Sequence, residues 1–409
     1  KLGIKDPYLK VYASSGYGNP KKVQELLRLE RPDAILHYTD PRFWGWLYNM
    51  EHEIRQHIPL MYLNIWDDLP YPFWNEPFYE SCDMIMNISK QTYNIVKNVI
   101  RKNPKPDWAI TYVPHGINEE EFFPINALHS NHKEYSDFED TFKKKHDVDF
   151  ILFWNNRNIR RKSPGDLILS YKTFCDKLPK EKADRCILLM NTQIRDDNGT
   201  DLAAVKNALC PDYKIEITNG GVDIKTLNYF YNISDVVINI ASNEGFGLSS
   251  AEALVTKTPI INNVTGGLQD QCRFHDEHGN WIDFTTDFPS NHDGTYQECG
   301  GWAKPVFPSN RSIQGSPLTP YIFDDRCDFR DVADAMLYWY EMSKEEREHR
   351  GELGYDWVTG EESNMTAKNM CKLMIKSIED CFEKWTPRKR FTLYKAEKKR
   401  KIEKPGVIV

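Results

Sequence analysis

Short apolar runs alternate with longer amphipathic spans through most of this 409-residue chain. The strand-like runs are YLKVYAS, DAILHYT, LMYLNIW, DMIMNIS and AITYV, then FILFWN, CILLMN, YKIEI, VVINIA and PIINN. Helix-like spans separate them, among them Asn19–Glu30, Lys90–Arg101, Asp166–Leu178 and Ile224–Tyr231. Because parallel strands need a crossover connection, usually a helix, the alternation predicts an α/β fold with parallel sheets flanked by helices.

A polar, charged stretch with little strand signal divides this pattern into two, and about 150 residues per domain also predicts two domains for this length. We expect a first domain over 1–125, a linker or insertion over 126–148, a second domain over 149–364, a helix over 365–385 that packs on a domain face or crosses back, and a basic tail over 386–409. Inside the second domain, the Gly-, Pro-, Ser- and Asn-rich region from Thr285 to Pro320 predicts a functional lid or a disordered insertion.

Composition excludes several classes of protein. The net charge of −7 argues against a nucleic-acid coat, although the tail from Arg388 to Lys404 is basic and could meet phosphates or simply be solvated. The nine cysteines are scattered without a CxxC pair, which favours reduced thiols over a disulfide framework or a zinc ribbon. No apolar run approaches the roughly 20 residues of a transmembrane helix, so we expect a cytoplasmic protein or one bound peripherally at a membrane.

The segment NEGFGLSSAEAL places two carboxylates, Glu244 and Glu252, around a glycine-rich bend between a buried strand and a helix start. A helix amino terminus presents backbone N–H groups to an anion, and Gly245 and Gly247 let the backbone approach it. The carboxylates would be repelled by phosphate and should reach past it to hydroxyl groups. The pattern therefore predicts a site for a nucleotide-diphosphate sugar, and the alternative is a loop charge followed by a charge in the first helical turn.

A basic cluster, RNIRRK, follows the strand FILFWN and carries Arg157 and Lys162 five residues apart. These cations could neutralise the charge on a departing diphosphate without a metal ion. Taken alone, the cluster is more often a solvated loop than a phosphate site. Neither a P-loop nor a dinucleotide-binding GxGxxG follows any strand, so those two kinds of phosphate site are not supported.

Together these segments resemble the retaining family-four glycosyltransferases of the GT-B fold. EGFGLSSAE matches the E-x7-E motif of that family, RNIRRK its Arg-x4-Lys pair, VPHGINEEEFFP its interdomain segment and TKTPIINNVTGGLQD the strand and Gly-Gly turn after the motif helix. The likeness is close from Arg157 to Asp270 and looser elsewhere. It implies two Rossmann-like domains with parallel sheets facing across a cleft, the first on the acceptor side and the second binding the nucleotide sugar.

The resemblance also implies a role for each matching residue. Glu244 would hold hydroxyls of the transferred sugar, Arg157 and Lys162 would clamp the leaving diphosphate, and the donor would further contact Gly245, Phe246, Gly247, Leu248 and Glu252. The sugar would be transferred with retention of anomeric configuration, and the leaving phosphate would take the acceptor proton. No cofactor or metal is then required, and the nucleotide-diphosphate sugar is a substrate.

Two departures from the family concern the first domain. Members usually begin with a strand and a glycine-rich loop that contacts the donor phosphates, whereas this chain opens at KLGIKDP, so we expect a domain truncated at its start. Many members carry a histidine after a middle strand, where this chain has Trp66, Asp67 and Asp68. These three are the acceptor-side candidates, and His37 is expected to be a core residue.

The acceptor itself is left open: a saccharide, a lipid-linked glycan, a protein or, as a minority alternative, modified DNA. Two other functions stay open for the chain as a whole. One is a nucleotide-sugar-binding protein without transferase activity, and the other is an epimerase of the GT-B fold.

Overall fold

The computed structural model describes residues 8–391, and its first half is built on a four-stranded parallel sheet in the order β1-β2-β3-β4. The strands are β1 (Ile35–Tyr38), β2 (Leu60–Asn64), β3 (Met84–Asn87) and β4 (Ile110–Tyr112). Helices connect or flank them: α1 (Pro20–Glu30), α2 (Gly45–Tyr48), α3 (Glu51–Ile54), α4 (Glu76–Glu80) and α5 (Lys90–Val99), with short 3₁₀ turns at Pro41–Trp44, Phe73–Asn75 and Asp107–Ala109. Every residue of β2 and β3 is buried, as expected for parallel strands covered on both faces.

The second half holds a six-stranded parallel sheet in the order β10-β9-β8-β5-β6-β7. Its strands are β5 (Phe150–Asn155), β6 (Cys186–Asn191), β7 (Ile215–Ile217), β8 (Val236–Asn239), β9 (Ile260–Asn263) and β10 (Ala303–Val306). Its helices are α7 (Pro164–Asp176), α8 (Lys180–Ala183), α9 (Leu202–Leu209), α10 (Ile224–Ile233), α11 (Leu248–Val255), α12 (Leu268–Cys272), α13 (Phe329–Glu341) and α14 (Lys344–Thr359), with a 3₁₀ turn at Arg160–Lys162. The strand order reverses between β5 and β8, and open α/β sheets bind ligands at the carboxyl ends of strands beside such a reversal.

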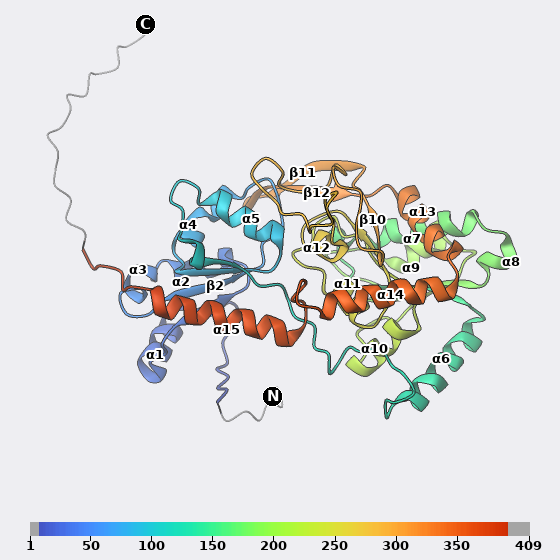
Figure 1. Cartoon of the computed structure of the whole chain (residues 1–409), viewed down its shortest axis with the longest axis horizontal. Helices are drawn as coiled ribbons and strands as arrows, with labels where there is room; N and C mark the ends of the chain where they lie inside the picture. The colour runs from blue at the N-terminus through green and yellow to red at the C-terminus, as the bar shows by residue number, and fades with distance from the viewer. Residues whose placement is uncertain (1–7, 392–409) are drawn as a thin grey trace, which may run out of the picture.

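Two further helices connect the halves. Residues 126–148, expected as a linker or insertion, contain α6 (His132–His146), which packs on α10 through Phe138 and Phe230. After α14 the chain returns to the first half, where α15 (Ala367–Lys384) lies beside β3 and runs beneath the first sheet in Figure 1.

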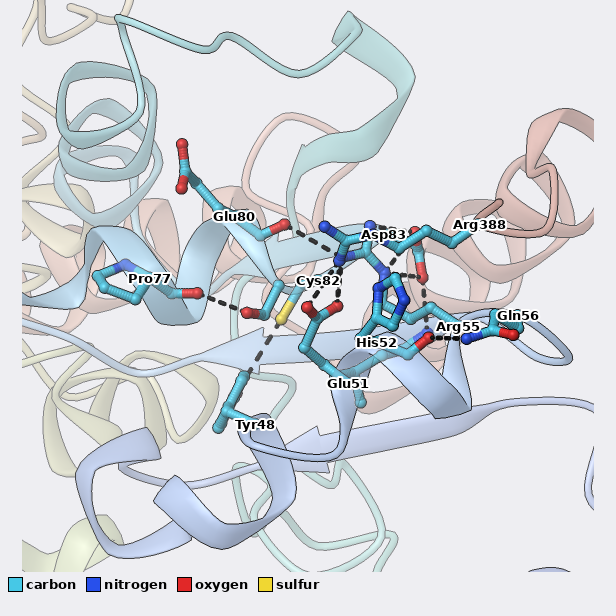
Figure 2. A network of polar contacts seen from close by, with 12 residues as sticks. Tyr48, Glu51, His52, Arg55, Gln56, Pro77, Glu80, Cys82, Asp83 and Arg388 are labelled. Atoms are coloured by element: carbon cyan, nitrogen blue, oxygen red, sulfur yellow. Dashed lines mark hydrogen bonds and ion pairs between the residues drawn. The ribbon is translucent and has the colours of Figure 1, made fainter. Parts of the chain in front are cut away.

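The segment after α15 is fastened to the far end of the first sheet (Figure 2). Arg388 donates to Glu51 at 2.6 Å and its backbone N–H donates to the carbonyl of Arg55 at 2.8 Å. The Arg55 guanidinium in turn donates to Asp83 at 2.8 Å, and Asp83 accepts the backbone N–H of Leu60 at 2.9 Å. The network therefore ties the carboxyl-terminal segment to the starts of β2 and β3. The basic tail lies outside the described residues from 392 onward.

The structure differs from the sequence-based expectation in two segments. YLKVYAS, residues 8–14, is predicted as a strand but is exposed and belongs to no sheet. The region from Thr285 to Pro320 contains β10 and most of an antiparallel hairpin formed by β11 (Asn310–Ser316) and β12 (Thr319–Arg326). The hairpin is half-exposed and largely polar, so its sequence lacks the apolar run that indicates a strand. Among residues 8–391, no helix is long and apolar enough to cross a membrane.

Candidate active site

The glycine-rich bend between β8 and α11 is shaped by backbone that only glycine tolerates. Gly247 has φ of +93° and stands directly before the first residue of α11. Gly266, in the turn after β9, has φ of +48°, and a Cβ there would lie 2.1 Å from the carbonyl oxygen of Glu244. The backbone N–H of Gly267 donates to that same carbonyl at 2.8 Å. The Gly266–Gly267 turn therefore supports the backbone that carries Glu244.

The Glu244 carboxylate is paired with two cations from the basic segment after β5. Lys162 forms an ion pair with it, and Arg161 donates to it at 3.2 Å and to the carbonyl of Asn243 at 2.8 Å. Burial opposes ionisation of Glu244, but Lys162 and Arg161 outweigh it and hold the pKa of this carboxyl below its usual value. Burial lowers the pKa of Lys162, and Glu244 opposes that shift. The result is a partly buried cluster of two cationic side chains and one carboxylate.

Arg157 is not brought to this cluster. Its guanidinium donates to Asp196 at 2.7 and 3.1 Å, and its side chain is 63% exposed. Arg161, which the sequence motif leaves unassigned, occupies the place beside Glu244 instead. The adjacent residue Arg160 has a different partner: its guanidinium lies 3.5 Å from the Asp324 carboxylate. The spacing of charges in RNIRRK does not show which arginine contacts Glu244. The directions of the Arg160, Arg161 and Lys162 side chains are set by a 3₁₀ turn.

Glu252, on α11, belongs to a polar network along the carboxyl ends of β5, β6 and β7. Tyr231 donates its hydroxyl to Glu252, and Asn155 donates to Tyr231 at 2.9 Å. Asn191 then donates to Asn155 at 2.9 Å, and Thr218 donates to Asn191 at the same distance. Burial raises the pKa of Glu252, while the Tyr231 hydrogen bond opposes the rise. The network presents hydrogen-bond donors and acceptors that suit a polar ring system.

A cavity of about 520 Å³ lies between the halves and is lined by some of the residues predicted for the two sides. Arg157, Lys162 and Glu252 are not among its lining residues. From the second half it is lined by Asn243 to Leu248, with Arg160 and Arg161. From the first half it is lined by Trp66, Asp67 and Asp68, the acceptor-side candidates, and by residues at the ends of β1 and β2. Phe246 is buried and packs edge-on against His115, which also lines the cavity.

The two aspartates differ in their environment although they are adjacent. Burial raises the pKa of Asp67, and Arg161 opposes that shift. Burial together with the neighbouring Asp67 raises the pKa of Asp68 well above its usual value. The pKa of both carboxyls is therefore raised, and the rise is larger for Asp68.

Gly245 lies at one of the contacts between the two halves. A Cβ on this residue would lie 3.0 Å from the carbonyl oxygen of Ile65 and 3.1 Å from Ile88. Both neighbours belong to the first half, at the ends of β2 and β3. A Cβ on Gly245 would also lie 3.7 Å from the Cβ of Asp67, so the absent side chain lets the bend approach Asp67. Within residues 8–391, no three His, Cys, Asp or Glu side chains converge as a metal site would require.

Comparison with known proteins gives partial matches in sequence. No family model matches the chain. The trehalose synthase of Thermococcus litoralis is 28% identical over 110 residues, which are 26% of this chain and 26% of that protein. The alpha-monoglucosyldiacylglycerol synthase of Acholeplasma laidlawii is 25% identical over 189 residues, which are 46% of this chain and 43% of that protein. The chain therefore spans less than half the length of these curated relatives.

Solved structures match over much more of the chain. A glycosyltransferase from Rickettsia africae has a TM-score of 0.62 at 16% identity, over 91% of this chain and 85% of its own. HepE of Anabaena in complex with UDP-glucose has a TM-score of 0.60 at 11% identity, over 89% and 81%. Sucrose-phosphate synthase of Thermosynechococcus elongatus has a TM-score of 0.56 at 14% identity, over 89% and 77%.

These likenesses establish the fold. The chain has the GT-B architecture, with two Rossmann-like domains whose parallel sheets face each other across a cleft. The fold class predicted from the alternating pattern and the motif resemblance is confirmed.

Proposed function

We propose that this protein is a retaining glycosyltransferase that uses a UDP-sugar. The observation that carries the proposal is the largely buried Glu244, held by two cations just before the helix α11 and lining the interdomain cavity. The names of the partial relatives, trehalose synthase and alpha-monoglucosyldiacylglycerol synthase, support sugar transfer. A solved GT-B neighbour with bound UDP-glucose supports the choice of uridine nucleotide.

The site residues take distinct roles in this proposal. Glu244 accepts hydrogen bonds from hydroxyls of the transferred sugar, and the backbone N–H groups at the start of α11 face the diphosphate. Lys162 and Arg161 neutralise the diphosphate as it leaves. Glu252 and the network beside Asn155 hold the ribose and the base. Arg157 could join the phosphates only by giving up Asp196.

The reaction needs no nucleophilic side chain. The acceptor oxygen forms a bond to the anomeric carbon on the face from which the diphosphate departs, and the bond from that carbon to the phosphate oxygen breaks. The acceptor hydroxyl proton passes to the departing phosphate oxygen. Asp67, close to Gly245, orients the acceptor hydroxyl on the first-domain side.

Release of UDP from UDP-glucose, followed with and without acceptors, tests the proposal. We expect Glu244→Gln to lower the turnover number by about 10²–10³-fold, because the transferred sugar loses the carboxylate that positions it. Glu277→Gln is the matched control, since this carboxylate is exposed and remote from the cavity. Proton NMR of the product reports the anomeric configuration, and an inverted product would refute retention.

The competing functions give different results in the same assay. A binding protein would be stabilised against heat by UDP-glucose but would release no UDP with any acceptor. An epimerase would convert the sugar while leaving it attached to UDP. Either result would replace the transferase assignment.

A further inference from the structure

The β11–β12 hairpin projects from the second domain and rests on the first (Figure 1). The backbone N–H of Phe323 donates to the carbonyl of Leu69 at 2.6 Å, and the Tyr321 hydroxyl donates to the carbonyl of Tyr71 at 3.1 Å. Tyr321 also packs edge-on against Trp74, with ring centroids 4.3 Å apart. The hairpin therefore packs on the aromatic loop that follows β2.

The hairpin tip is held by a second contact from the first domain. Arg42 donates to the carbonyl of Leu318 at 3.1 Å, and the same guanidinium is fixed by Asp40 and lies 5.1 Å from the Trp66 ring centroid. A side chain with three simultaneous partners is costly to move. The hairpin is consequently a fixed third wall of the cavity, in addition to the two domains.

The part of the hairpin that lines the cavity is mainly polar. The hairpin residues that line the cavity are Gln314, Gly315, Ser316, Thr319 and Ile322, whereas Ile313 is 56% exposed and does not line it. Leu318, also apolar, is exposed outside the cavity. Within the described part of the chain, no hydrogen bond joins the side chains of Gln314 or Ser316 to a protein group.

The opposite wall offers complementary groups. Asp67 and Asp68 face the same cavity as Gln314 and Ser316, so carboxyl, amide and hydroxyl groups surround one space. Paired hydroxyls on a ring match such a set, because carboxylates accept from adjacent hydroxyls and an amide both donates and accepts. An alkyl chain would leave these groups unpaired, at a cost in desolvation.

We propose that the β11–β12 hairpin is the acceptor-binding wall of the active site and that the acceptor is a saccharide. The saccharide is held between Gln314 and Ser316 on the hairpin and Asp67 and Asp68 on the first domain. This inference rests on the proposed transferase function and adds the class of acceptor to it. The hairpin grips the acceptor and leaves the donor untouched, so donor binding and acceptor binding are separable by mutation.

The test has a donor arm and an acceptor arm. In the donor arm, UDP-glucose is added to the wild-type protein and to the Gln314→Ala/Ser316→Ala double variant, and the melting temperature is measured. In the acceptor arm, UDP release is measured with glucose, mannose, maltose or cellobiose, and separately with vesicles of phosphatidylcholine and dioleoylglycerol. Ile313→Ala is the matched control, because it lies on the same strand with its side chain away from the cavity.

We expect a saccharide to stimulate UDP release and the double variant to raise the KM for that saccharide about tenfold, from the loss of two hydrogen-bonding groups. The thermal shift with UDP-glucose and the KM of the control stay at wild-type values. Stimulation by dioleoylglycerol vesicles alone, or an unchanged saccharide KM in the double variant, overturns the inference while the donor arm still supports a transferase. Absence of any shift with UDP-glucose overturns the donor assignment and this inference together.

Discussion

At the scale of single residues, the site is organised around the buried charge of Glu244. Two cations compensate it, and of these Lys162 is almost completely buried, with a side chain 9% exposed. A buried cation beside a departing diphosphate acts in a medium of low dielectric, where each charge is worth more than in water. Exposed Arg157, paired with Asp196, has neither the position nor the burial.

We therefore expect Lys162→Ala and Arg157→Ala to differ in their effect on UDP release. Lys162→Ala should lower turnover by about 10²–10³-fold, the range found when one group that stabilises developing charge is removed. Arg157→Ala should lower it by less than about tenfold, the part attributable to a screened surface charge. Initial rates at saturating UDP-glucose measure both. Equal losses would mean that Arg157 leaves Asp196 when the donor binds.

The support beneath Glu244 gives a second prediction at this scale. A Cβ at Gly267 would lie 2.3 Å from the carbonyl oxygen of Gly245, which is backbone and cannot yield cheaply. Gly267→Ala should therefore displace the bend, reduce the thermal shift caused by UDP-glucose and destabilise the fold by about 1–3 kcal/mol. Gly165→Ala is the control, because nothing lies within 4 Å of its Cβ position. Thermal unfolding with and without UDP-glucose compares the two, and a normal shift in Gly267→Ala would contradict the prediction.

At the scale of elements, the sequence predicts those parts of the fold that have a strong apolar period. FILFWN and CILLMN are continuous apolar runs, and they form β5 and β6. Every residue of Phe150–Trp154 and of β6 is buried, as such runs predict. The β11–β12 hairpin was missed because its stability comes from contacts with a distant loop, including Leu69 and Tyr71, which no local pattern contains. The same limit applies to the site. The motif indicated Glu244 and Lys162, but the tertiary direction of Arg161 depends on a 3₁₀ turn.

The network that anchors the carboxyl-terminal segment gives a prediction about an element. Asp83 accepts three contacts from Arg55 and one from Leu60, and removing it leaves the guanidinium of Arg55 with Glu51 and the Glu80 carbonyl as partners. Asp83→Ala should lower the free energy of unfolding by about 2–3 kcal/mol. Arg388→Ala removes only a partly exposed ion pair, so its cost should stay below about 1 kcal/mol. Urea unfolding ranks the two, and a larger cost for Arg388→Ala would contradict this reading of the network.

At the scale of the whole molecule, the two domains meet through a carboxylate placed at a helix start. Asp270, on α12 of the second domain, accepts the backbone N–H of Lys90 at 3.0 Å, in the first turn of α5 of the first domain. It also accepts the Tyr112 hydroxyl at 3.2 Å. Beside it, Gln269 donates to Gln91 at 3.0 Å across the same interface. Domain contact in this protein therefore includes a fully buried titratable group.

Burial raises the pKa of Asp270 to about 7, against the partial compensation provided by Lys90 and Tyr112. The carboxyl is then protonated in the folded protein at pH values where the unfolded chain has already lost the proton. Folding takes up a proton in that interval, so this group makes the protein less stable as pH rises from about 4 to about 7, and the loss is complete above the folded pKa. The charges facing it are Lys90 and Asp283, the latter opposing ionisation.

Asp270→Asn should remove this dependence, because the amide keeps an acceptor oxygen for Lys90 and Tyr112 but cannot ionise. The variant should gain stability relative to the wild type as pH increases from 5 to 8, and the difference should level off above pH 8. Melting temperatures of both proteins across this interval measure the effect, with Asp283→Asn as the control for the exposed carboxylate nearby. A difference that stays constant with pH would show that Asp270 is already ionised in the folded protein. The domain interface would then be held by a buried charge rather than by a neutral carboxyl.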